Sequence, residues 1–251
     1  MTSRPVALQM FAVREAAAAD FAGVLKRIAD MGYAGIECGV PRGMSAGQLA
    51  QLAGSLGLRI PSVHLGFPAP DNIERIAADA RALGVRRIIT GFGHNEMDSA
   101  EAVADCARRL ACACELAGSV GLSLGIHNHW WEFDRQFDGR TPFEILMSEV
   151  PAAFSELDIY WCARGGQDVA AVAARWADRI PLLHVKDGDL GPESFHTAVG
   201  DGKVPVRRVI EAACHAEWLI VELDNCRTDM FDAVAKSLGW LIGSGLGHGR
   251  R

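Results

Sequence analysis

The segment LGIHNHWWEF, residues 124–133, contains in short form the pattern on which the whole chain is organised. An apolar run ends at His127, and His129, two tryptophans and Glu132 follow at once. Apolar residues followed directly by side chains that bind metals or protons are typical of a buried strand that opens into a catalytic site. A surface loop with two histidines beside an aromatic patch is the alternative for this segment taken alone.

The composition describes an ordinary globular chain. Its 251 residues suit one large domain, and 49% of them are hydrophobic, which is enough for a sizeable core. The net charge of -6 and the pI near 5.7 argue against a general nucleic-acid or anionic-membrane binder. No apolar run approaches the roughly 18 residues that span a bilayer. We expect neither a nucleic-acid partner nor a membrane partner.

The cysteines and the first residues favour the cytoplasm. Seven cysteines occur without a CxxC pair, so neither a disulfide framework nor zinc-finger spacing is present. The first residues, MTSRP, lack the apolar region of a signal peptide. A reducing, cytoplasmic location is therefore expected.

Short apolar runs alternate with helix-period segments along the chain. Strands are predicted at 6–11, 36–38, 60–63, 85–89, 122–126, 154–157, 180–183 and 218–221. Helices are predicted at 16–31, 45–56, 72–83, 99–120, 142–150, 168–176, 204–216 and 229–242. Ser45, Ser99 and Thr141 are suitable N-caps, and Glu144 completes a capping box with Thr141.

Eight strand–helix units without a linker predict a single (β/α)₈ TIM barrel over residues 1–242. The alternative is an open doubly wound sheet, which usually carries a Gly-rich phosphate loop after its first strand. Here the first strand runs into Met10-Phe11-Ala12 instead, so we favour the barrel. The Gly-rich segment 243–251 is predicted to be a flexible C-terminal tail.

Polar residues follow seven of the eight predicted strands, and only the fourth, which ends in Thr90-Gly91-Phe92, lacks one. Catalytic groups of such barrels lie at the carboxyl ends of the strands, so these side chains are expected to converge. They are Gln9, Glu37, His64, His127, His129, Glu132, Asp158, His184, Lys186, Asp187, Glu222 and Asp224.

Four of these residues would form a metal site: Glu132, Asp158, His184 and Glu222. Mostly oxygen ligands with one imidazole suit Mn²⁺ or Mg²⁺, and Co²⁺ or Zn²⁺ would also be tolerated. Burying several carboxylates together is very costly without a cation or protons, which favours a bound metal.

Each of these residues also has a purely structural interpretation. Asp158 could instead cap a helix or form a salt bridge. His184 follows a buried run, where a core histidine bonded to the backbone is common. Glu222 could pair with a lysine instead of a metal.

Aromatic residues and the remaining histidines carry weaker signals. Trp130, Trp131 and Trp161 more often pack in a core or a lid, although beside an acidic metal site they could hold the apolar face of a sugar. The other histidines lie in loops, a helix and the tail and are expected at the surface: His94, His196, His215 and His248.

The strand ends carry an ordered set of short motifs: LQM at 8–10, GIE at 35–37, SVH at 62–64, HNHWWEF at 127–133, ELDIYW at 156–161, GG at 165–166, HVKD at 184–187, GDG at 200–202 and VE at 221–222. In this order they resemble the sugar phosphate isomerase/epimerase family, whose barrels are xylose isomerase-like. The resemblance covers nearly the whole chain. It implies one divalent ion held by Glu, Asp, His and Glu from strands five to eight.

Three of those ligands carry over from the resemblance directly, as Asp158, His184 and Glu222. The strand-five ligand does not, because His127 stands where many relatives have glutamate directly after the strand. We favour Glu132 as this ligand, with His127 or His129 as the alternative. If His127 takes the place, it is either a ligand or the acid/base group.

A DNA-repair relative on the same barrel, endonuclease IV, has a three-zinc site with more histidines. One of them follows the strand-six aspartate by three residues, where this chain has Trp161. The acidic net charge also disfavours DNA, so this interpretation ranks low.

The resemblance implies an isomerase or epimerase that acts on a keto or aldo sugar, or a polyol, through an enediolate. Glu222 and either Glu132 or His127 would exchange the carbon-bound proton. Lys186 would hold a hydroxyl, an enolate oxygen or a phosphate. The side chains expected to bind the substrate are Glu37, His64, His129 and Trp161.

Two other outcomes stay open. The same enediolate can expel a leaving group, which would make the protein a dehydratase or lyase on a keto-sugar or keto-inositol. The other outcome is a barrel that binds a ligand without catalysing a reaction. Asp187, Asp189 and Asp201 crowd the Gly-containing loop after strand seven, so we favour an unphosphorylated substrate. Pairing of copies through outer helices into a homo-oligomer is a further expectation.

Overall fold

The centre of the structure, a computed structural model that describes residues 3–250, is a barrel of eight parallel strands. Neighbouring strands pair in parallel around the barrel, and β1 pairs with β10. A bridge between Cys38 and Val63 joins β2 to β3 and so closes the ring. The strands are β1 (Arg4–Gln9), β2 (Gly35–Glu37), β3 (Val63–His64), β4 (Arg87–Thr90), β5 (Ser123–His127), β6 (Phe154–Asp158), β7 (Leu182–Val185) and β10 (Trp218–Val221). The predicted (β/α)₈ barrel is confirmed.

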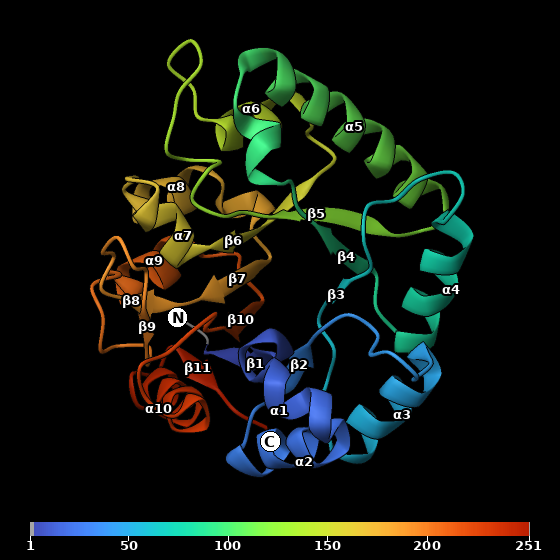
Figure 1. The fold of residues 1–251 in the computed structure, drawn as a ribbon, viewed down its shortest axis with the longest axis vertical. Helices are drawn as coiled ribbons and strands as arrows, with labels where there is room; N and C mark the ends of the chain where they lie inside the picture. The colour runs from blue at the N-terminus through green and yellow to red at the C-terminus, as the bar shows by residue number, and fades with distance from the viewer. Residues whose placement is uncertain (1–2, 251) are drawn as a thin grey trace.

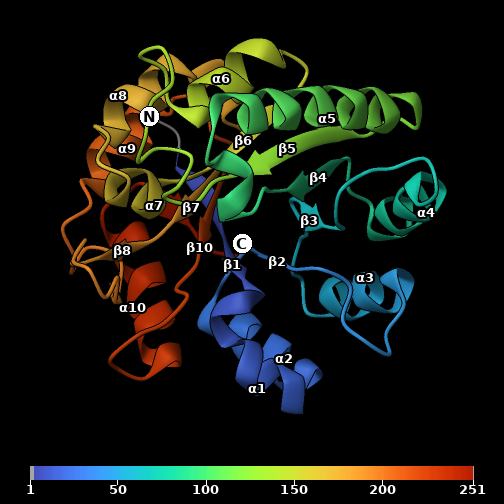
Figure 2. The ribbon, with the colours of Figure 1, turned by 45° about the horizontal axis from the view of Figure 1, so that its top comes forward.

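Helices surround the strands (Figure 1), and α5 runs beside β5 when the molecule is turned (Figure 2). They are α1 (Arg14–Ala19), α2 (Phe21–Met31), α3 (Ala46–Ser55), α4 (Ile73–Leu83), α5 (Ala100–Ser119), α6 (Pro142–Glu149), α7 (Ile159–Arg164), α8 (Val169–Arg175), α9 (Val206–Ala212) and α10 (Met230–Gly243). Three short 3₁₀ helices join them: η1 (Met10–Val13), η2 (His94–Met97) and η3 (Ala177–Arg179). Among the helices of residues 3–250, none is long and apolar enough to cross a bilayer.

The predicted N-caps start the helices as expected. Ser45 Oγ accepts a hydrogen bond from the Gln48 amide at 3.2 Å, and the Ser99 side chain accepts one from Ala102 at 3.1 Å. At α6 the Thr141 hydroxyl accepts from the Glu144 amide at 3.2 Å, while the Glu144 carboxylate accepts from the Thr141 amide at 3.0 Å. These contacts satisfy backbone donors that a helix leaves free at its start.

The predicted helix over 16–31 is two helices. Asp20 separates α1 from α2 with non-helical backbone angles (φ -148°, ψ 84°), and its carboxylate accepts from the Gly23 amide at 2.8 Å. Helix α7, which the periodicity did not predict, begins directly after β6. Asp158 ends that strand and caps the helix, leaving no turn residues to separate the two elements.

Strand alternation sorts the barrel interior into an apolar end and a polar end. Successive side chains of a strand point to opposite faces, so every second residue faces the barrel interior. In β10, Trp218 and Ile220 belong to a small apolar cluster of the interior, and Glu222 continues the same row. In β7, Leu182 belongs to that cluster and His184 follows it. Apolar residues therefore fill the amino end, and polar residues collect at the carboxyl end.

The segment predicted as a flexible tail is instead held against the barrel over its described part, residues 243–250. The short strand β11 (Gly247–His248) pairs with Arg4 and Pro5 of β1. The Arg250 amide also donates to the Gly32 carbonyl at 2.8 Å. A side chain at Gly247 would meet the Val6 side chain at 2.5 Å, so glycine permits this close approach.

Candidate active site

A pocket of about 720 Å³ opens at the carboxyl ends of the barrel strands, where barrels of this kind place their catalytic groups. One wall is polar and is formed by strand-end residues together with the loops that follow them. These residues are Gln9, His64, His127, His129, His184, Lys186, Glu222 and Asp224.

Four side chains from four strands converge beside this pocket, and we call His127, Asp158, His184 and Glu222 the donor group. Each offers one ligand atom, and these atoms all lie within 4.8 Å of one another. His184 Nδ1 lies 2.8 Å from Glu222 Oε2, and His127 Nε2 lies 3.8 Å from Asp158 Oδ2. Two imidazoles and two carboxylates at this spacing can hold a divalent metal ion.

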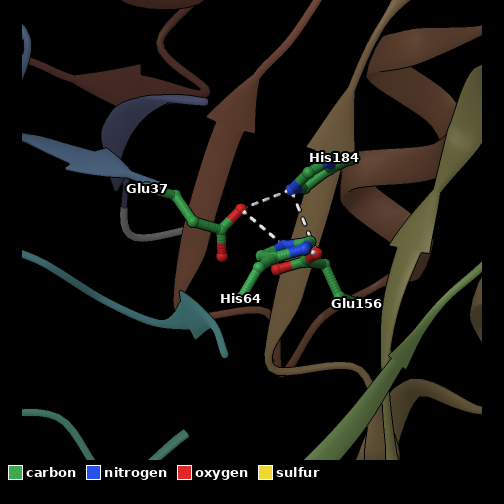
Figure 3. A group of neighbouring side chains, drawn as sticks. All are labelled: Glu37, His64, Glu156 and His184. Carbon is green, nitrogen blue, oxygen red and sulfur yellow. Dashed lines mark hydrogen bonds and ion pairs between the residues drawn. The ribbon is translucent and has the colours of Figure 1, made fainter. Parts of the chain in front are cut away.

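Two further carboxylates, Glu37 and Glu156, lie behind the donor group and contact its histidines from the other side. His184 Nε2 lies 2.7 Å from Glu37 Oε2 and 3.1 Å from Glu156 Oε2, as Figure 3 shows. His127 Nδ1 lies 3.3 Å from Glu156 Oε2. Each histidine thus turns one ring nitrogen toward the donor group and the other toward an outer carboxylate.

His64 joins the two outer carboxylates on the pocket side. Its Nε2 lies 3.4 Å from Glu37 Oε2 and 3.2 Å from Glu156 Oε2 (Figure 3). Burial alone would lower the pKa of His64, but Glu37 and Glu156 raise it to about 10. His64 is therefore an imidazolium that offers positive charge at the wall of the pocket.

Glu37 is ionised although it is fully buried. Burial would raise its pKa, but the charges of His64 and His184 lower the pKa well below its usual range. Gln9 Nε2 donates to Glu37 Oε2 at 2.9 Å, and the Ser62 hydroxyl donates to Glu37 Oε1. These donors hold the carboxylate in one orientation against His184.

Lys186 places a fixed positive charge among the carboxylates. Its Nζ lies 3.0 Å from Asp158 Oδ2, 2.8 Å from Glu222 Oε2 and 2.9 Å from Asp224 Oδ1. Burial would lower the pKa of Lys186, yet these carboxylates raise it, so the side chain stays an ammonium. The suggested pairing of Glu222 with a lysine is therefore observed, alongside its place in the donor group.

Two members of the donor group, His127 and Asp158, are suited to a cation in their protonation. His184, in contrast, would have to release a proton: burial would lower its pKa, but Glu156 and Glu37 raise it well above its usual range. Burial lowers the pKa of His127 to about 3, which keeps its imidazole neutral and able to donate a lone pair. Burial raises the pKa of Asp158 to about 6, against the opposing charge of Lys186. Asp158 Oδ2 is buried and makes no hydrogen bond in the described chain, and its charge is balanced by the Lys186 ammonium at 3.0 Å.

Asp158 caps a helix, one of the roles that its sequence position suggested, and also belongs to the donor group. Its Oδ1 accepts from the Trp161 amide at 2.9 Å and so caps α7, while Oδ2 faces the donor group. The Asp158 amide donates to Asn128 Oδ1 at 2.9 Å, which fixes the end of β6 against the end of β5.

Glu132 lies apart from the donor group. Its carboxylate turns back into the loop after β5 and accepts from the His129 amide at 2.8 Å. Burial raises its pKa to about 8. The structure therefore brings His127, the alternative in the sequence analysis, next to Asp158, His184 and Glu222, and it does not bring Glu132 there.

The other predicted substrate contacts differ in position. His129 lines the pocket and stacks on Trp131 with ring centroids 4.1 Å apart. Burial lowers the pKa of His129 to about 4, so it is neutral. The Trp161 ring lies 5.7 Å from Lys186 Nζ, but Trp161 is not among the residues that line the pocket.

Sequence reasoning gave Glu156 no role and expected a different setting for His196 and Asp187. Glu156 lies two positions before Asp158 in β6, so strand alternation predicts that both face the interior. His196, expected at the surface, is buried, and its Nδ1 accepts from the Asp224 amide at 2.9 Å. Asp187, expected to crowd the following loop, organises it: its carboxylate accepts from Gly188, Gly200, Gly202 and Val204 amides.

Sequence and structure comparisons agree with this architecture. The chain belongs to the xylose isomerase-like TIM barrel family, whose model matches residues 25–243. No curated protein sequence matches the chain significantly.

Three similar solved structures share the fold at low identity. A sugar phosphate isomerase/epimerase from Parabacteroides distasonis has 21% identity and a TM-score of 0.75, over 98% of this chain and 95% of that one. A probable 3-DHS dehydratase from Bacillus anthracis has 15% identity and a TM-score of 0.74, over 96% and 99%. An L-ribulose 3-epimerase has 20% identity and a TM-score of 0.73, over 98% and 95%.

Proposed function

We propose that this protein is a divalent-metal-dependent isomerase or epimerase that acts on a keto or aldo sugar, or on a polyol. The observation that carries the proposal is the donor group, four ligand-type side chains whose ligand atoms lie within 4.8 Å of one another beside a pocket of about 720 Å³. The family, and the isomerase and epimerase among the similar structures, point to the same class of reaction.

The donor group would hold the metal, with His127 in the place that the sequence analysis assigned to Glu132. Two imidazoles among the ligands favour Mn²⁺, Co²⁺ or Zn²⁺ over Mg²⁺, which prefers oxygen ligands. When bound, such an ion would stabilise negative charge on the substrate oxygens as an enediolate forms.

The outer carboxylates would set which ring nitrogen each ligand histidine offers. A histidine that binds a metal usually donates its other N–H to a carboxylate, which fixes its tautomer and orientation. Glu37 lies 2.7 Å from His184 Nε2, which leaves Nδ1 directed at the donor group. Glu156 Oε2 lies 3.3 Å from His127 Nδ1 without a hydrogen bond between them, and His127 Nε2 faces Asp158.

Proton transfer is assigned to Glu222, which lines the pocket. Burial would raise its pKa, but Lys186 and His184 lower it well below its usual range, so it is a carboxylate that can accept a carbon-bound proton. Lys186, 2.8 Å from Glu222 Oε2, would stabilise the adjacent enolate oxygen. His64 and the neutral His129, which both line the pocket, would bind hydroxyl groups.

Metal analysis with a matched pair of variants tests this proposal. Purified wild-type protein should contain a divalent ion, and its conversion of a keto-sugar in a panel should stop with chelator and return with Mn²⁺. Glu222→Gln should abolish conversion. Glu217→Gln, the same substitution at the other end of β10 where Glu217 pairs with Arg87, should not. A metal-free protein with chelator-resistant activity, or one that only binds sugar, would overturn it.

A dehydratase or lyase is the second candidate, because a probable dehydratase is among the similar structures. The same enediolate would expel a hydroxyl group instead of returning the proton. Mass spectrometry separates the two reactions. In ordinary water, isomerisation conserves the substrate mass, whereas dehydration removes one water. In deuterated water, the isomerised product gains deuterium from the solvent.

A further inference from the structure

The pocket has a second wall that the proposed chemistry does not use. Opposite the strand-end histidines and carboxylates, apolar side chains line it from η1, α1, α2 and the loop after β2. We call these residues the apolar wall: Met10, Phe11, Ala17, Ala18, Phe21 and Pro41. Figure 2 shows α1 and α2 side by side, standing out from the end of β1.

Phe11 is the most exposed part of the apolar wall. It is 50% exposed and, with Ile242 at 46%, is one of two exposed large apolar side chains in residues 3–250. Its exposure does not follow from a loose segment, because the other three residues of η1 are buried. The segment is therefore anchored by its other residues while the Phe11 side chain, which lines the pocket, stays exposed.

Arg14 holds this part of the wall in place. It donates to the Phe11 carbonyl at 2.9 Å and to the Asp224 carbonyl at 3.0 Å, which ties η1 to the loop after β10. Its guanidinium also lies 4.1 Å from the centre of the Phe11 ring. The Arg14 guanidinium therefore covers one face of the Phe11 ring, and the rest of the ring lines the pocket.

The charges of the pocket do not favour a phosphate. Of its lining residues, Arg14, Lys186 and the His64 imidazolium are positively charged, and His64 lies within 3.4 Å of the Glu37 and Glu156 carboxylates. Arg14 donates to two carbonyls, and Lys186 lies within 3.0 Å of three carboxylates. Glu222 and Asp224 would repel a second negative group at the polar wall.

We propose that the substrate is a keto-sugar joined to an apolar group, such as an aryl or alkyl glycoside in which a ketone on another carbon stays free for the enediolate chemistry, rather than a free sugar or a sugar phosphate. This rests on the proposed function, since the sugar ring would lie at the donor group and the apolar group against Phe11, Ala18 and Phe21. A volume of 720 Å³ suits a drug-sized ligand and exceeds what one sugar ring fills. Burying the apolar group and the Phe11 ring together removes two apolar surfaces from water.

Binding of paired probes tests this inference. Calorimetry on the Mn²⁺-loaded protein would compare the binding affinities of the methyl and the phenyl glycoside of each keto-sugar in the panel. The phenyl compound should bind about tenfold more tightly, and Phe11→Ala should remove that advantage while leaving methyl-glycoside binding unchanged. Ile242→Ala removes the other exposed large apolar side chain and should keep the tighter binding of the phenyl glycoside.

The outcomes separate this inference from the proposed function. Equal binding of both glycosides that depends on Mn²⁺ would overturn the apolar subsite and leave the metal enzyme intact. Binding of neither glycoside, together with no retained metal, would overturn the proposed function itself. Sedimentation supplies the remaining outcome: a dimer that Phe11→Ala dissociates and Ile242→Ala does not would make this wall an interface between copies and overturn the subsite.

Discussion

The two halves of the barrel use the same strand–helix unit for different purposes. The half formed by β5, β6, β7 and β10 supplies the whole donor group, one residue from each strand. The half formed by β1 to β4 supplies Gln9, Glu37 and His64, which contact the donor histidine or its partners from behind. The first half also carries η1 and α1 of the apolar wall.

This difference separates residues that would touch the reacting groups from residues that position them. A barrel strand delivers one inward side chain to the rim, and its neighbours in the ring determine what that side chain contacts. Substitutions in the donor group should therefore remove the chemistry, whereas substitutions of the carboxylates behind it, Glu37 from β2 and Glu156 from β6, should weaken it.

Asp158→Asn should have the largest effect, because it removes a charged donor and keeps the Oδ1 atom that caps α7. We expect loss of bound metal and a fall in kcat/KM of about 10²–10³-fold, the size found when one charge-stabilising group is removed. Metal content and steady-state kinetics would measure it. Asp168→Asn, the same change at the cap of α8, is the control and should leave both unchanged. Full activity in Asp158→Asn would contradict the donor group.

A paired substitution decides the strand-five ligand. His127→Gln should weaken Mn²⁺ binding by at least about tenfold, because it removes a donor atom beside Asp158. Glu132→Gln should retain the metal, since that carboxylate accepts from the His129 amide instead. Calorimetric titration with Mn²⁺ measures both. The opposite result would return Glu132 to the ligand set.

Glu37→Gln and Glu156→Gln should have intermediate effects of about 10–100-fold on metal affinity or activity, since both act through a histidine. Glu37→Gln should also release His184 from one orientation, because it removes the carboxylate at 2.7 Å. A merely structural role would lower stability without changing Mn²⁺ affinity, so urea unfolding and metal titration are measured together. Glu217→Gln is the matched surface control.

The smallest effect concerns stability and pH. Burial raises the pKa of Glu132 to about 8, so the folded state holds its proton more tightly than the unfolded chain does. This contribution to the free energy of unfolding is complete below about pH 4.5 and is lost as the pH rises through 8.

Glu132→Gln has no such proton to lose. In chelator, its stability relative to wild type should therefore rise between pH 5 and pH 9, by at most about 1.4 kcal/mol per pH unit. Urea unfolding at three pH values checks this. A constant difference across that range would show that Glu132 titrates normally.

Much of the architecture was predictable from local pattern. Apolar runs that end in polar residues marked the strand ends, and Thr141 with Glu144 marked the start of α6 correctly. The periodicity missed the break at Asp20, because a run of alanines continues a helical pattern up to it. It also missed that residues 247–248 pair with β1, which depends on a strand edge far away in the sequence.

The site was predictable in its members more than in their contacts. Asp158, His184 and Glu222 were expected to converge, and they do. Glu156 was missed although its spacing from Asp158 places both on one face of β6. Asp158 was expected either to cap a helix or to join the metal site. Its Oδ1 caps α7, and its Oδ2 lies in the donor group.

The sequence by itself determined the barrel and the rim residues, because strand and helix periods and strand-end chemistry are local properties of the chain. Tertiary structure decided the choice between His127 and Glu132. After β5 the chain leaves the strand, and the path of the loop turns the Glu132 carboxylate back onto the His129 amide. His127 is the last residue of β5, so strand alternation directs its side chain into the barrel, where it faces Asp158 on the neighbouring strand β6. Direction in a strand follows from alternation, whereas direction in a loop depends on the contacts that the fold supplies.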